Sequence, residues 1–155
     1  MSSEAPGLYV HIPFCSSICP YCDFSVLKAG VPARERFVEH LVAEAALAGR
    51  EWQDREAFDT VYFGGGTPSV LPPEDLERVL GACGAHLTLA TPAPWIFLEV
   101  NPEDVTPEAC AAWRALGVIA HAGEIGRRRH YALERYAQPL ETRLLASVER
   151  WGRAT

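Results

Sequence analysis

Three short apolar segments, each followed by a stretch of helical periodicity, constrain the fold of this chain more than any other feature. The apolar segments cover residues 8–12, 60–63 and 95–100. Helices are expected to begin near Pro32, Pro73 and Pro107, because proline suits the first helical turn, where its missing N–H costs no hydrogen bond. Strands that alternate with helices are typical of βα units and a parallel sheet. We therefore predict an α/β fold with three to four βα units, forming part of a (β/α) barrel or an open doubly wound sheet.

The ends and buried faces of the predicted helices follow from the same pattern. The first helix should end at Gly49, and the third should be capped by Thr106 and stopped by Gly117. The third strand is apolar throughout, as expected for a strand covered on both faces. The core-facing residues expected on the first two helices are Phe37, Leu41, Ala45 and Ala48, then Leu76, Val79, Leu80 and Cys83.

Residues suited to chemistry follow each predicted strand. HIPFCSSICPYC follows the first strand, GGGTPS (64–69) follows the second, and Glu99 with Asn101 and Pro102 closes the third. In barrels and doubly wound sheets alike, functional sites lie at the carboxyl ends of the strands. We therefore expect these three segments to form one site.

Cys15, Cys19 and Cys22 form a C-x3-C-x2-C motif. The five cysteines are an odd number and the N-terminus lacks a secretion signal, which favours a metal or redox site in a reducing compartment over a disulfide framework. Thiolates suit zinc or iron–sulfur clusters. A zinc site usually has four protein ligands, and His11 is the nearby residue that could complete it. On a four-iron cluster, three thiolates leave one iron open to an exogenous chelating group.

The glycine-rich segment and Glu99 favour a small polar ligand. Without Cβ atoms, the backbone of Gly65 and Gly66 can approach a charged ligand closely, and Thr67 adds a hydroxyl. Glu99 can accept hydrogen bonds from a cationic or hydroxylated ligand. The structural alternatives are a tight turn for the glycines and a surface carboxylate for Glu99.

Composition narrows the class of protein. Apolar residues make up 48% and charged residues 22% of the chain, as in globular proteins, and no apolar stretch reaches the length of a membrane span. A net charge of −6 gives no general attraction to nucleic acid, and the arginines at 127–129 are expected on a solvated surface. We expect a cytoplasmic protein that binds no nucleic acid.

The motifs together resemble a known family. YVHIPFCSSICPYCDF, GGGTPS and EVNPEDVT are similar to the radical S-adenosylmethionine superfamily, and within it to the oxygen-independent coproporphyrinogen III oxidase group that includes the heme chaperones. The resemblance covers about residues 8–118. It implies a partial (β/α) barrel of which this chain supplies the N-terminal part.

The resemblance also implies the cofactors. Cys15, Cys19 and Cys22 would bind a [4Fe–4S] cluster, and S-adenosylmethionine would chelate its open iron. One electron from the cluster would break the sulfonium C–S bond, giving methionine and a 5′-deoxyadenosyl radical. Gly65, Gly66 and Thr67 would bind its methionine moiety. The full set of residues that would contact S-adenosylmethionine is Tyr9, Tyr21, Gly65, Gly66, Thr67 and Glu99.

The residues after Cys22 bear on the subfamily. Members that oxidise coproporphyrinogen typically carry another cysteine two residues further on, whereas Asp23 and Phe24 follow here, as in the heme chaperones. The resemblance thus favours a heme chaperone, with the porphyrinogen oxidase as the enzymatic alternative. Implied partners are S-adenosylmethionine, heme or porphyrinogen, and an electron donor such as flavodoxin or ferredoxin.

From residue 119 onward the chain departs from the family pattern. The family's later cofactor-binding glutamine, arginine and aspartate are not found there, and its heme-binding C-terminal domain would lie further on. We expect a radical SAM core over 1–118 and a divergent tail over 119–155, arising from truncation or a changed reading frame. Pro139 would start one amphipathic helix over 139–151. The hypothesis of another class is a non-catalytic fragment that binds a cluster or zinc.

Overall fold

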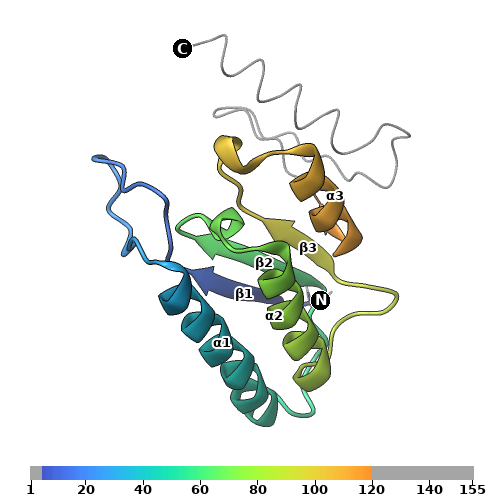
Figure 1. Cartoon of the computed structure of the whole chain (residues 1–155). Helices are drawn as coiled ribbons and strands as arrows, with labels where there is room; N and C mark the ends of the chain where they lie inside the picture. The colour runs from blue at the N-terminus through green and yellow to red at the C-terminus, as the bar shows by residue number, and fades with distance from the viewer. Residues whose placement is uncertain (1–4, 120–155) are drawn as a thin grey trace.

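The strands of the fold form one parallel sheet. The computed structural model describes residues 5–119 of the chain. The strands are β1 (Gly7–Ile12), β2 (Thr60–Gly65), β3 (Trp95–Leu98) and β4 (Val118–Ile119). They pair in parallel in the order β1-β2-β3-β4, and Figure 1 shows the first three side by side. A doubly wound sheet reverses its strand order at a switch point, so the unbroken chain order confirms the barrel-type alternative.

Three helices follow the strands at the places that the prolines predict. They are α1 (Val31–Glu51), α2 (Pro73–His86) and α3 (Pro107–Ala115). Thr106 caps α3, since its Oγ1 accepts a hydrogen bond from the Ala109 N–H at 3.1 Å. Gly117 has φ +80°, the left-handed conformation that commonly ends a helix. Two single turns, η1 (Pro68–Val70) and η2 (Pro102–Asp104), lie in the loops after β2 and β3.

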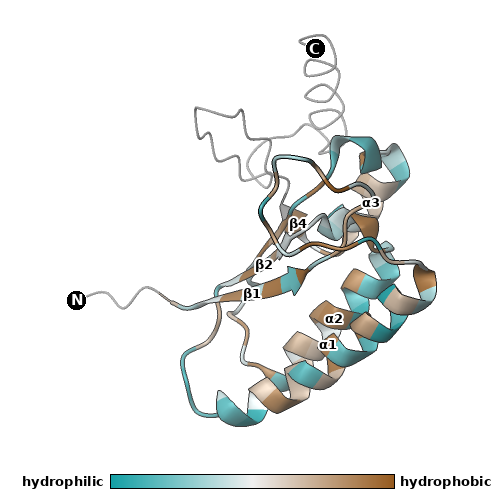
Figure 2. Cartoon of the chain, turned by 90° about the vertical axis from the view of Figure 1, so that its left-hand side faces the viewer, coloured by the Kyte–Doolittle hydropathy of each residue, from teal (hydrophilic) through white to brown (hydrophobic). Residues whose placement is uncertain are grey.

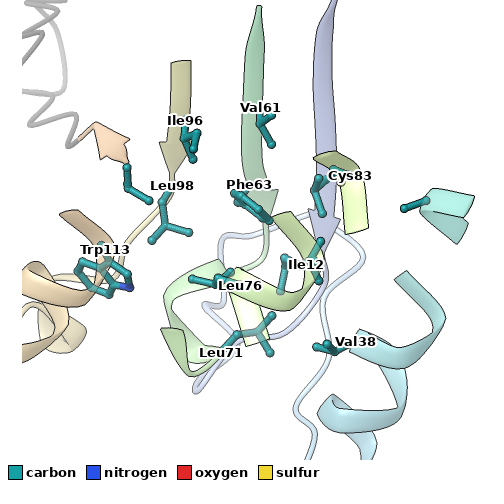
Figure 3. Close-up of a cluster of buried hydrophobic side chains, with 14 of the residues drawn as sticks. Ile12, Val38, Val61, Phe63, Leu71, Leu76, Cys83, Ile96, Leu98 and Trp113 are labelled. Atoms are coloured by element: carbon teal, nitrogen blue, oxygen red, sulfur yellow. The ribbon is translucent and has the colours of Figure 1, made fainter. Parts of the chain in front are cut away.

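One face of the sheet packs against the helices, and this side holds the core. Alternate strand residues point toward α1 and α2, which lie on one side of β1 and β2 (Figure 2) and pack against each other. Figure 3 shows the strand side chains meeting those of the helices and of Leu71, which directly follows η1. The strand residues of this cluster are Val10, Ile12, Val61, Phe63, Ile96, Leu98 and Val118.

The predicted helix faces are largely confirmed. On α2, Leu76, Val79 and Cys83 are buried, and Leu80 is half-buried beside them. On α1, Ala45 is buried, and Phe37, Leu41 and Ala48 pack against the core as half-buried neighbours. Val38 is fully buried as well, although it was not among the predicted residues.

The third strand differs from its prediction. It ends at Leu98 instead of Val100, and Trp95 is exposed while Phe97 is half-buried. The prediction that the third strand is covered on both faces is therefore wrong within residues 5–119. The second face carries large aromatic side chains, which gives the segment the same apolar character as a strand buried on both sides.

The helices of the described part and the predicted tail bear on the extent of the fold. No helix within residues 5–119 is long and apolar enough to cross a lipid bilayer. The predicted tail over 119–155, with its helix over 139–151, lies outside the described residues except for position 119.

Candidate functional site

The three segments predicted to form a site leave the sheet at the same edge. The loop from β1 to α1 carries the cysteines and projects beyond the ends of the strands (Figure 1). The glycine-rich loop follows β2, and Glu99 stands directly after β3. Parallel strands bring these exits together because all their carboxyl ends lie at one edge.

The cysteine loop is closed at its base. Phe14 and Leu27 form an isolated parallel bridge, in which the Leu27 N–H donates to the Pro13 carbonyl at 2.9 Å. The Cys15 N–H donates back to the Leu27 carbonyl at 3.2 Å. Residues 15–27 therefore leave and rejoin the sheet edge at one point, and Phe14 is buried beneath it.

The three motif cysteines lie on this loop as free, half-buried thiols. The Cys22 N–H donates to the Cys19 carbonyl at 3.1 Å, so a tight turn connects the second and third thiols. The Thr67 hydroxyl donates to the Cys15 Sγ at 3.5 Å, linking the glycine-rich loop to the first thiol. Within residues 5–119, no three Cys, His, Asp or Glu side chains are arranged around a single metal ion.

The glycine-rich loop packs directly onto the end of β1. The Gly66 N–H donates to the Ile12 carbonyl at 2.8 Å, and the Thr67 N–H donates to the Phe14 carbonyl at 2.7 Å. A Cβ atom at Gly66 would lie 2.6 Å from the Phe14 oxygen. Glycine is required here because the segment that leads into the cysteine loop occupies that space.

Gly65 connects this loop to Glu99. Its φ of +120° is a conformation that residues with a Cβ rarely adopt, and a Cβ there would lie 2.6 Å from the His11 ring. Its N–H donates to the Glu99 Oε2 at 3.0 Å. The N–H groups of Gly65, Gly66 and Thr67 thus all donate within the chain, which the glycine pattern did not indicate.

Glu99 is held by a second donor. The Tyr62 hydroxyl donates to its Oε1 at 2.8 Å, so each carboxylate oxygen accepts one hydrogen bond from β2. The Tyr62 ring stacks between those of Tyr9 and Phe97, with centroids 5.9 Å and 6.1 Å away. Burial, and then the hydrogen bond to Glu99, raises the pKa of Tyr62 to about 12, so the hydroxyl keeps the proton that it donates.

The two predicted tyrosines lie in different places. Tyr9 lies on the second face of the sheet, where its hydroxyl is 3.3 Å from the His11 Nδ1. Tyr21 lies on the cysteine loop and is 85% exposed. Its hydrogen bond with the Cys19 thiol raises the pKa of Tyr21. The structure therefore brings Tyr9 near Glu99 through Tyr62, and Tyr21 near the cysteines.

Two residues of the site were missed by the sequence reasoning. The apolar character of the strand over 60–63 gives no sign of a role for Tyr62, although strand alternation places it on the face opposite Val61 and Phe63. Ser69 is buried, with its hydroxyl donating to the Asp104 Oδ2 at 2.6 Å. Its place in the GGGTPS segment was the only sequence signal for it.

The donor set fits an iron–sulfur cluster. Three free thiols stand on one loop outside the packed core, and the Thr67 hydroxyl of the glycine-rich loop lies 3.5 Å from the first of them. Cysteine thiolates are the usual ligands of such clusters. Cys83 and Cys110, by contrast, are buried in the core, where burial raises the pKa of the Cys83 thiol.

Comparison with known proteins gives a consistent family. Residues 9–146 match the model of the Radical SAM superfamily. A heme chaperone, HemW, from Mycobacterium tuberculosis is 39% identical over 120 residues, which cover 76% of this chain and 30% of the relative. An oxygen-independent coproporphyrinogen III oxidase from Pseudomonas aeruginosa is 27% identical over 155 residues, covering 93% of this chain and 32% of that protein.

A solved structure agrees in fold. The radical SAM enzyme coproporphyrinogen III oxidase (HemN) from Escherichia coli superposes with a TM-score of 0.66 at 26% identity, over 74% of this chain and 26% of that one. The chain therefore spans about a third of the length of the curated relatives that it matches. The family match, the parallel sheet and the cysteine loop together show that this chain belongs to the radical SAM superfamily, whose cofactors are S-adenosylmethionine and a [4Fe–4S] cluster.

Proposed function

We propose that Cys15, Cys19 and Cys22 bind a [4Fe–4S] cluster and that the loops after β2 and β3 hold S-adenosylmethionine against it. The observation that carries this proposal is the contact between the Thr67 hydroxyl and the Cys15 Sγ at 3.5 Å, because it places the glycine-rich loop beside the first thiol. When bound, the cluster supplies one-electron reductive cleavage of S-adenosylmethionine.

The residues of the chain would bind and orient this cofactor. Since the N–H groups of Gly65, Gly66 and Thr67 donate within the chain, the loop would offer carbonyl oxygens and the Thr67 hydroxyl to a cationic amino group. Glu99, whose oxygens each accept one hydrogen bond, retains lone pairs for ribose or amino donors. Tyr9 and Tyr21 would line the site from the sheet and from the cysteine loop.

Within the family, we propose a heme chaperone over a coproporphyrinogen oxidase. Asp23 and Phe24 follow the third cysteine, and the relative named as a heme chaperone is more similar than the one named as an oxidase, at 39% against 27% identity. The partners would then be heme and a reduced electron donor such as flavodoxin or ferredoxin, in the cytoplasm. Conversion of coproporphyrinogen III distinguishes the two, because only the oxidase would carry it out.

Anaerobic reconstitution tests the cluster assignment. We expect about four irons and four sulfides per chain and an electron paramagnetic resonance (EPR) signal after reduction that changes on addition of S-adenosylmethionine. Cys19→Ala should lower the cluster yield strongly. Cys83→Ala removes a thiol that is buried in the core and is not part of the cysteine motif, so it should leave the cluster yield unchanged.

Other results would contradict the cluster or the chaperone proposal. Stoichiometric zinc with no uptake of iron would favour a zinc site, which usually has four protein ligands. An equal iron content in Cys19→Ala and the parent protein would refute the three-thiolate assignment. Rapid conversion of coproporphyrinogen III by this chain would refute the chaperone proposal while leaving the cluster assignment intact.

A further inference from the structure

The backbone at Glu99 and just after it is tied to β2 and to the loop that follows β2. The Glu99 N–H donates to the Phe63 carbonyl at 3.0 Å, and the Asn101 N–H donates to the Ser69 Oγ at 3.0 Å. The first of these bonds extends the β2–β3 pairing beyond the strand. The second depends on a side chain, so a single substitution can remove it.

Ser69 joins the loop after β2 to two points of the segment 101–104 through one hydroxyl. It accepts the hydrogen bond from the Asn101 N–H and donates one to the Asp104 Oδ2 at 2.6 Å. A short O–H···O contact to a carboxylate is among the stronger hydrogen bonds in proteins. Ser69 is only 9% exposed, so a lost partner here would leave polar groups in a place that water reaches poorly.

The turn that carries Ser69 is itself anchored. The Arg34 guanidinium of α1 donates to the Val70 carbonyl at 2.8 Å. Through η1, the long helix α1 therefore supports the segment 101–104, which lies immediately after Glu99. This support comes from a rigid element of the fold, as positioning groups for a binding site require.

The Glu99 side chain makes the position of its backbone important. Its two oxygens accept from the Gly65 N–H at 3.0 Å and the Tyr62 hydroxyl at 2.8 Å, distances that tolerate only small shifts. We propose that Ser69 is a positioning residue, which holds the backbone after β3 so that Glu99 stays on Gly65 and Tyr62, ready to bind S-adenosylmethionine. The identity of this ligand rests on the proposed function above.

The expected effect follows from preorganisation. Without the Ser69 hydroxyl, the segment after Glu99 samples more conformations, and a ligand must then restrict them on binding. Since one net hydrogen bond of this kind corresponds to roughly a tenfold change in an equilibrium constant, we expect Ser69→Ala to weaken S-adenosylmethionine binding about tenfold. Cluster content should not change, because Ser69 contacts none of the cysteines.

Amide hydrogen exchange on the chain without cofactors provides the first test. In Ser69→Ala, the Gly65 amide should exchange about tenfold faster than in the parent, although Gly65 does not contact Ser69. Asp104→Asn keeps an acceptor for the hydroxyl but loses the carboxylate charge, so its Gly65 exchange should lie between those of the parent and Ser69→Ala. Thr106→Ala removes the α3 cap, which destabilises the protein to a similar degree without touching this network.

The second test measures S-adenosylmethionine affinity from the change in the EPR signal of the reconstituted cluster. Ser69→Ala should bind about tenfold more weakly with an unchanged iron content, while Thr106→Ala should bind like the parent and Asp104→Asn should lie between the two. An equal loss of affinity in Thr106→Ala would overturn the inference, because general destabilisation would then account for the effect. Parent-like exchange at Gly65 in Ser69→Ala would overturn it as well.

These two tests separate the inference from the proposed function. If the parent protein binds no S-adenosylmethionine, the proposed function fails, and the positioning of Glu99 is then decided by the exchange measurement alone. If the parent binds it and Ser69→Ala binds it equally well, the inference fails while the proposed function stands.

Discussion

Substitution of Gly66 by alanine should damage both the fold and the cluster site. A Cβ atom at this position would lie 2.6 Å from the Phe14 oxygen and 3.0 Å from each of the Phe14 and Pro13 carbonyl carbons. All three are backbone atoms, so the clash cannot be relieved by a side-chain rotation. The glycine-rich loop and the start of the cysteine loop would have to separate.

The magnitude follows from what that separation breaks. The bonds from Gly66 N–H to the Ile12 carbonyl (2.8 Å) and from Thr67 N–H to the Phe14 carbonyl (2.7 Å) join the two segments. Overpacking costs about 1–3 kcal/mol and each of the two weakened hydrogen bonds adds roughly 0.5–1.5 kcal/mol, so we expect a loss of about 2–6 kcal/mol. This is a large share of the roughly 5–15 kcal/mol by which domains are typically stable.

Urea denaturation followed by circular dichroism measures this loss, and iron content after reconstitution measures the effect on the cysteine loop. Gly81→Ala is the matched control, because a Cβ there has no neighbour within 4 Å and alanine favours a helix by about 0.5–1 kcal/mol. Gly66→Ala should be less stable than the parent and incorporate less iron, while Gly81→Ala should be slightly more stable. Parent-like stability and iron content in Gly66→Ala would refute this account of the glycine.

Two further predictions concern the helices and the second face of the sheet. Gly49→Ala should lower the free energy of unfolding, measured in urea, by about 1–3 kcal/mol, because its Cβ would clash with the backbone carbonyl of His86 where α1 and α2 meet. An unchanged midpoint of urea unfolding would contradict this packing. The pKa of Tyr62 is raised from 10.0 to about 12, so its contribution to stability is complete below pH 10 and is lost as the pH rises toward 12. Tyr62→Phe should therefore lose less stability than the parent between pH 10 and 12, and identical pH profiles would contradict the raised pKa of Tyr62, which burial and then the hydrogen bond to Glu99 cause.

The fold could be predicted from local signals to a large extent. Proline at the first turn of each helix and Thr106 as a cap are strong because they act within a few residues. The alternation of strands and helices is also read from local patterns, and a parallel sheet follows from it. What the pattern left open was barrel-type or doubly wound topology, because strand order depends on contacts between distant segments.

The interior of the candidate site was harder to predict. The cysteine motif and Glu99 are visible by residue type, but the partners of Glu99 are not, since Tyr62 is 37 positions away in the sequence. The role expected for the glycines was also incomplete. Their missing Cβ atoms accommodate His11 and the backbone of Phe14, which is a demand of packing between neighbouring strands.

The bridge between Phe14 and Leu27 makes the cysteine loop a self-contained insert in the architecture. Because its two ends are fixed together by the sheet edge, the length and sequence between them can change at a modest entropic cost to the fold. Evolution can therefore vary the surroundings of the thiols, and so the reactivity of what they bind, without redesigning the barrel beneath. The same property makes residues 15–27 a natural unit for exchange between related proteins.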